Sequence, residues 1–429
     1  MLLTVTTASY AQDSKVVTGS LAGRYHFRTT GGEQDHDIET IATLNFGDSN
    51  KHRFTGAIQG GGLFDLNGDN AAYFSNIYNT FSNSSVGRLY YAYMDVNRFG
   101  PVNQLRIGRQ HKYSLDSLYF DGASLETHTY SGFTLGAFGG VPVHQFESQL
   151  GFDYGDWVAG GSLQWRPIAI MQFKFDITYL RDKLTGFRVA AGDQSDTLMG
   201  GSVWIDVVKW LHVYSRVTAF TDQMRDFEIG ATVKLPDQDL RFRLSGYRLL
   251  NGYAIRVLEW DVFGVAGTYV PYTQVALTAT KGFAEKFYVD AGFIGRFLAN
   301  DQTASAFNHG YQRYFLSFST FDWMLKGLTL STTADYYHGT DNILKNNTAG
   351  LSFDAAHEFS KKFKLNAGTA FYFYRYNFNL GNESDNVRTL YAGVNWTVIK
   401  NFTTKANYEF EHNDYNDFHT VKLSLIWKF

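Results

Sequence analysis

The last nine residues, VKLSLIWKF (residues 421–429), alternate large apolar side chains with mostly polar ones up to the final residue. The apolar positions on one side of this segment are Val421, Leu423, Leu425, Trp427 and Phe429. A period of two residues is typical of a β-strand with one apolar face. An amphipathic helix would instead repeat its apolar residues every three or four positions. The stretch therefore predicts that the chain ends in a β-strand.

The same alternation recurs along the chain. It is clearest in residues 17–28, 226–235 and 402–411, and similar stretches lie near 38–46, 173–181, 198–208, 211–220, 287–297, 326–337 and 363–374. The strands of a transmembrane β-barrel are about ten residues long and alternate lipid-facing apolar with lumen-facing polar side chains. All five prolines fall between such stretches, as the hydrogen bonding of a sheet requires. The pattern predicts many antiparallel strands joined by turns.

Composition excludes several classes of protein. The chain has no cysteine, which removes disulfides, thiolate zinc sites, iron–sulfur clusters and covalent haem attachment. Its 38 basic residues nearly balance its 41 acidic ones, which argues against a partner such as nucleic acid that is bound by neutralising phosphates. No apolar run approaches the roughly 20 residues that a membrane-spanning helix needs.

The alternating last strand with its terminal Phe429 resembles the final strand of bacterial outer-membrane β-barrel proteins. This resemblance implies a location in the bacterial outer membrane, in contact with its lipid and lipopolysaccharide. It also implies that Val421, Leu423, Leu425, Trp427 and Phe429 form the signal read by the barrel-assembly machinery. The fold class that we expect is all-β, a single transmembrane antiparallel up-and-down barrel of about 22 strands, with 20 to 24 compatible with the pattern. The alternative, a soluble β-sandwich array or propeller, would show internal repeats or linkers, and none is evident.

The organisation that we expect is a remnant of a signal peptide in residues 1–11, with cleavage after Ala11, followed by the barrel in residues 12–429. A disordered N-terminal arm is the alternative for the first segment. The longest connection is Gly62–Ser85, which is rich in aromatic residues. It could fold into the lumen as a constriction, cap the outer mouth or contact a partner. Two stretches, 144–157 and 250–271, are compatible with either one long strand or an extra hairpin.

Strand parity also predicts which charged side chains point into the lumen. The candidates are Arg24, Glu39, Lys174, Asp176, Arg216, Glu228, Lys234, Arg241, Arg243, Asp290, Arg313, Asp335, Lys405 and Glu409. Both signs are present, so no strong ion selectivity follows. Arg241 and Arg243 form a short basic ladder, predicted to lie opposite Asp226 and Glu228. We favour mutual charge pairing across these strands over a transverse field that orients solutes. Arg106 is predicted to face the lumen, and Arg109 the lipid side, where it could reach lipopolysaccharide phosphates.

The sequence offers no candidate for chemistry. The twelve histidines show no metal-binding spacing, and no motif of a nucleophilic serine occurs. We therefore predict no catalytic residues, no metal and no cofactor, and the protein is not expected to be an enzyme.

The function that we expect is a porin-like channel through which small polar solutes diffuse passively. Wide barrels of 22 strands usually contain a plug, and too few residues precede the first strand to supply one. The alternative is therefore a sheath around a multihaem cytochrome, as in porin–cytochrome electron conduits, in which every haem would belong to the partner. A third alternative is a barrel that exports a polymer.

Overall fold

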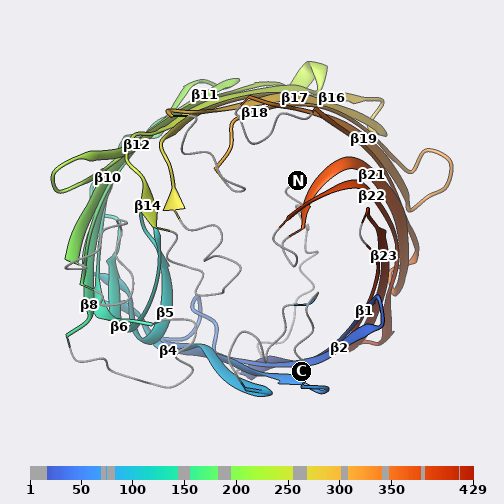
Figure 1. Ribbon diagram of the computed structural model, residues 1–429. Coiled ribbons are helices and arrows are strands. Elements are labelled where there is room, and N and C mark those ends of the chain that lie inside the picture. The colour runs from blue at the N-terminus through green and yellow to red at the C-terminus, as the bar shows by residue number, and fades with distance from the viewer. Residues whose placement is uncertain are drawn as a thin grey trace.

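The computed structural model describes residues 17–68, 74, 83–143, 155–181, 195–254, 268–300, 308–340, 347–377, 382–414 and 416–429. These residues form a ring of tilted strands around an axis (Figure 1). In chain order, the strands are β1 (Val17–Thr30), β2 (Glu33–Phe46), β3 (Phe54–Asp65), β4 (Ser85–Phe99), β5 (Val102–Tyr113), β6 (Ser117–Thr127), β7 (Phe133–Pro142), β8 (Trp157–Ile168), β9 (Met171–Arg181), β10 (Ser195–Val208), β11 (Leu211–Phe220), β12 (Met224–Leu235), β13 (Leu240–Leu249), β14 (Tyr253–Ala254), β15 (Thr268–Tyr269), β16 (Tyr272–Phe283), β17 (Phe287–Leu298), β18 (Tyr311–Phe321), β19 (Leu328–Gly339), β20 (Thr348–Ser360), β21 (Phe363–Asn377), β22 (Asn382–Ile399), β23 (Phe402–His412) and β24 (Asp417–Lys428).

The ring closes because the first strand pairs with the last. β1 runs antiparallel to β24 from Ser20 opposite Lys428 to Thr29 opposite His419. The seam continues to the final residue, since the Gly19 amide donates to the Phe429 carbonyl at 3.1 Å and the Phe429 amide donates back at 3.0 Å. A closed sheet leaves no unpaired strand edge, which is the condition for crossing a bilayer with strands.

The barrel has 22 strands, and the all-β antiparallel prediction is confirmed. The two remaining strands, β14 and β15, pair only with each other, so that β13 is followed in the barrel by β16. This short hairpin lies in the stretch 250–271, for which the sequence left two interpretations open. No helix among the described residues is long and apolar enough to cross a membrane.

Side chains alternate between the two faces of the wall as the sequence pattern requires. Large apolar residues are exposed on the outer face, for example Leu21, Ile107, Leu316 and Leu425, each 46–56% accessible. Exposing so many apolar side chains to water costs free energy, whereas contact with lipid hydrocarbon does not. The outer face therefore suits a lipid environment. The opposite face carries most of the charged strand residues and is called the inner wall below.

The two rims of the barrel differ. One rim, called the short-turn rim, carries connections such as the two residues 361–362 between β20 and β21, together with the end of β24. The tryptophans predicted for an interfacial belt lie at this rim and are 38–50% exposed, namely Trp165, Trp210, Trp323, Trp396 and Trp427. The other rim, called the loop rim, carries the longer connections, but the turns after β1, β5, β11 and β23 are also short there.

Two sequence predictions concern segments that the structure describes only in part or not at all. The predicted signal remnant, residues 1–11, lies outside the described residues. The proposed connection Gly62–Ser85 is shorter than expected, because β3 extends to Asp65 and β4 begins at Ser85. Within that connection, Phe74 is buried, its ring packs edge-on against Phe418 at 6.1 Å, and the Arg28 guanidinium lies 5.1 Å from its centre.

Candidate functional site

The inner wall of the barrel is the candidate site, since it surrounds the axis of the ring. The strand register places the predicted lumen residues on this face, opposite to the exposed apolar side chains. That they line the path of a solute stays a prediction.

Many of these candidates neutralise one another. Arg24 and Glu39 lie directly opposite on β1 and β2 with 2.7 Å between Nη1 and Oε2, and Arg216 and Glu228 lie opposite on β11 and β12 at 3.3 Å. Two further pairs, Lys174–Asp176 at 2.9 Å and Arg313–Asp335 at 2.6 Å, complete this set. Three of these four pairs join neighbouring strands and Lys174–Asp176 lies along β9, so pairing of opposite charges accounts for much of the inner wall.

The basic ladder on β13 is an exception, and the expectation of mutual pairing is wrong there. Arg241 lies opposite Lys234, and Arg243 lies opposite Thr232. Asp226 and Glu228 lie farther along β12, opposite Leu249 and Tyr247. The error has a simple origin, because alternation shows which face a side chain occupies but not its neighbour across the strand boundary.

At the loop rim, the end of β5 and the start of β6 fold into the ring, which the sequence did not predict. In Figure 1 these strands lie on the inner side of β8. Their apolar side chains form a buried cluster with residues of the inner wall of β7 to β11, each at most 9% exposed. Its members are Leu115, Leu118, Phe120, Phe138, Val158, Leu180, Leu198 and Phe220. We call residues 109–121 the inward hairpin.

Polar contacts anchor the tip of the inward hairpin. Asp116 pairs with the buried Arg225 of β12 at 2.9 Å, although the two residues are 109 positions apart. The Ser114 hydroxyl donates to the Asp176 carboxylate at 3.3 Å. Leu115 packs against Gly200 of β10 so closely that a Cβ there would overlap its side chain. The tip is therefore tied to β9, β10 and β12, and it covers part of the inner wall.

A row of glycines allows the wall to bend at the base of this hairpin. Gly108, Gly122 and Gly140 lie side by side on β5, β6 and β7. A Cβ on Gly122 or on Gly140 would collide with the backbone of the neighbouring strand, and Gly108 has a φ of +126° that other residues rarely adopt. The absence of a Cβ therefore lets the strand backbones lie close together at this row.

Comparison with solved structures relates this geometry to known proteins. A mutant of the ferric enterobactin receptor PfeA from Pseudomonas aeruginosa superimposes with a TM-score of 0.58, at 10% identity, over 97% of this chain and 81% of that one. The translocation pore of the P pilus usher PapC gives 0.54 at 9% identity over 96% and 99% of the two chains. The Pseudomonas aeruginosa protein OpdQ gives 0.46 at 13% identity over 97% and 99%. No family model and no curated protein sequence matches the chain.

The fold is that of a bacterial outer-membrane β-barrel. The closed sheet and the lipid-compatible outer face locate the protein in that membrane.

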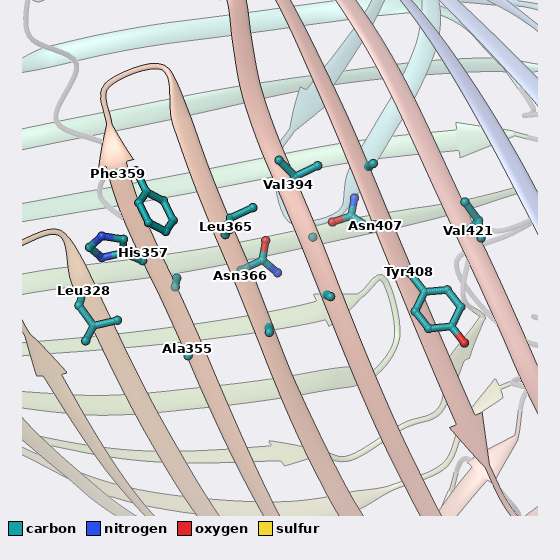
Figure 2. A pocket seen from close by; sticks show the side chains of 15 residues that line it. Leu328, Ala355, His357, Phe359, Leu365, Asn366, Val394, Asn407, Tyr408 and Val421 are labelled. Carbon is teal, nitrogen blue, oxygen red and sulfur yellow. The ribbon is translucent and has the colours of Figure 1, made fainter. Parts of the chain in front are cut away.

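The outer face of this outer-membrane barrel has a shallow apolar recess (Figure 2). It runs across β19 to β24, where the small side chains of Ala355, Ala367 and Ala392 stand in line through the strand register. Larger neighbours such as Phe359 and Tyr408 border it. Since these residues belong to the lipid-facing side, the recess is not part of the inner wall.

The predicted orientation of two arginines of β5 is correct for Arg106 and wrong for Arg109. Arg106 pairs with Asp95 of β4 at 2.8 Å on the inner wall, as predicted. Arg109 does not reach toward lipid, because its side chain is 1% exposed and pairs with Asp121 at 2.7 Å. It belongs to the inward hairpin, and this explains why strand parity alone misplaced it.

The structure shows how the predicted assembly signal closes the barrel. Its apolar side chains point to lipid, with Leu425 and Trp427 about half exposed, while the Phe429 ring lies over Gly19 of β1.

Among the described residues, no group of three histidine, aspartate or glutamate side chains is arranged to hold a metal ion.

Proposed function

We propose that this outer-membrane barrel is a channel through which small polar solutes diffuse passively. The observation that carries this proposal is a closed wall with charged, hydrogen-bonded side chains inside and apolar side chains outside. A polar interior keeps water and dissolved solutes in contact with protein groups that can replace their hydration.

The inward hairpin supports a channel for small molecules. A cylinder of 22 strands would leave a wide opening, and known barrels of this size are filled. Here the apolar cluster under the hairpin and its Asp116–Arg225 ion pair hold protein inside the ring. The remaining path is narrower than the strand number alone suggests.

Conductance of the purified protein tests this proposal. In planar lipid bilayers with potassium chloride, we expect stepwise currents, and proteoliposomes should swell in small sugars but not in large ones. A folded barrel, verified by heat-modifiable migration in electrophoresis, that neither conducts nor admits sugars would contradict the proposal. Co-purification of a haem-staining cytochrome, with electron transfer into proteoliposomes only in its presence, would instead support the sheath alternative.

A further inference from the structure

Three cationic side chains gather on the inner wall where β12 turns into β13, near the short-turn rim. Lys234 lies directly opposite Arg241, and Arg243 follows two residues later on the same face. All three side chains are exposed. Like charges that face each other across a strand boundary destabilise a sheet, so this arrangement opposes folding unless a counter-charge is present.

Within the described residues, no carboxylate lies within ion-pair distance of these three cations. Asp237 and Asp239, in the turn between the two strands, make no ion pair with the three cations, and the Asp239 carboxylate lies against Gly282 of β16. Farther along β12, Glu228 pairs with Arg216 and accepts a hydrogen bond from Tyr214, and Asp226 pairs with Arg225. Asp290, two strands from Arg241 in the same row, accepts a hydrogen bond of 2.6 Å from Thr280. The three cations therefore have no ion-pair partner among the described residues, and their charge remains available to an anion dissolved in the lumen.

The spacing of the patch suits a small molecule with several anionic groups. Residues two apart on a strand are separated by about 7 Å, and Cβ atoms directly opposite each other by about 5 Å. Two guanidinium groups and one ammonium provide many N–H donors and no acceptor. Hydroxyl groups flank them, since Arg243 lies between Thr232 and Thr278, and Thr280 lies beside Arg241.

We propose that Lys234, Arg241 and Arg243 form a binding subsite for small organic anions with two or more carboxylates, located on the inner wall near the short-turn rim. The subsite rests on the proposed channel function, because a solute must enter the lumen to reach it. Such an anion would contact two or three of the cations at once, whereas an anion with one carboxylate would contact fewer. The barrel should therefore prefer multivalent anions over monovalent anions and neutral sugars.

The test is block of the current by citrate, with acetate and glucose as comparison solutes. Citrate should reduce the potassium chloride current at lower concentration than acetate, and glucose should not compete with it. In the Arg241→Gln/Arg243→Gln double variant, the half-blocking citrate concentration should rise at least about tenfold, since charge-assisted hydrogen bonds are lost. The reversal potential in a salt gradient should also shift toward cation preference.

A matched control removes the same charge from other surfaces. Arg248 lies on the same strand but on the outer face, and Lys209 lies in the turn between β10 and β11. The Lys209→Gln/Arg248→Gln variant should retain citrate block. An equal loss of block in both variants would show a general field effect and would overturn the local subsite.

The remaining outcomes separate this inference from the channel proposal. A wild-type barrel that conducts but is not blocked by citrate, or a double variant blocked as before, overturns the subsite alone. A folded barrel without conductance overturns the channel proposal. Calorimetric titration of citrate into the detergent-solubilised protein then still tests the subsite, because heat of binding should be present in the wild type and absent in the Arg241→Gln/Arg243→Gln variant.

Discussion

The terminal residue of the chain has a defined structural role. The backbone of Phe429 forms two hydrogen bonds with Gly19, and its ring covers this glycine. The last residue is therefore part of the seam between β1 and β24, and it is more than a tag at the end of a strand. A charged side chain in its place would be exposed to lipid near the membrane interface.

We expect Phe429→Glu to reduce the amount of assembled barrel in the outer membrane several-fold. The change removes the aromatic cover of Gly19 and weakens the signal that the resemblance to other barrels assigns to this strand. Abundance and heat-modifiable migration in membrane fractions measure the effect, with Phe429→Tyr as the control that keeps the ring. Unchanged assembly of the glutamate variant would count against the predicted signal.

Single residues also show what the sequence could not reveal. The face of Arg241 and Arg243 follows from alternation, but their opposition to Lys234 depends on the register. Register is set by turn geometry across a strand pair, and the short helical turn Pro236–Gln238 before Asp239 is a feature that periodicity does not encode.

At the scale of elements, the inward hairpin is the feature with the clearest consequence for passage. Its tip is held by the burial of Leu115 against Gly200 and by the ion pair between Asp116 and Arg225. Both contacts join distant parts of the chain, so loosening them should free the tip without opening the barrel wall.

We expect Leu115→Ser/Asp116→Asn to raise the single-channel conductance to about twofold or more, because lumen width controls flow through a barrel. Planar bilayer recordings measure the change. The matched control is Leu325→Ser, which alters an exposed leucine in the turn between β18 and β19, away from the hairpin. If conductance is the same in all three proteins, the hairpin does not narrow the path.

The glycine row at the base of the hairpin yields a separate prediction. Gly122→Val places a branched side chain where the Gly139 carbonyl of the next strand already lies. Overpacking of this kind costs roughly 1–3 kcal/mol, so the urea midpoint of unfolding in detergent should fall. Gly23→Val is the control, since nothing lies within 4 Å of a Cβ at Gly23, and its midpoint should change little. Equal midpoints in the two variants would contradict a close approach of the strands at this row.

The hairpin also marks the limit of reasoning from alternation. Leu118 and Phe120 are apolar residues at inner-wall positions, and the glycines of β5, β6 and β7 are visible in the sequence. These signals could have indicated a second layer inside the barrel. They could not identify what the layer packs on, because Arg225 and Gly200 are about a hundred residues away in the chain.

At the scale of the whole molecule, the closed sheet could be predicted from the sequence, but the inward hairpin inside the ring could not. The antiparallel order, the outer face and a count near 22 strands follow from a period of two and the positions of the turns, whereas the sequence left 20 to 24 strands open. These properties are repeated along the chain, so a local error in one strand does not alter them. The lumen depends instead on individual contacts between distant strands.

The outer face gives a prediction for the protein as a whole. The folded barrel should remain dispersed in detergent and aggregate when detergent is removed, because its exposed apolar residues need a hydrocarbon partner. Sedimentation measures this behaviour, and circular dichroism should show β-structure with almost no helix. A chain that stays dispersed in buffer alone would be incompatible with a membrane barrel.

The pairing of β1 with β24 has a consequence for the order of events in the cell. The ribosome makes the partner of the first strand last, and synthesis of some 400 intervening residues separates the two halves of the seam. Contacts so distant in sequence form slowly. Until they form, β1 has an open edge that could join a neighbouring chain. Closure of the barrel therefore has to wait until the last strand has been made, and the edge of β1 stays open until then.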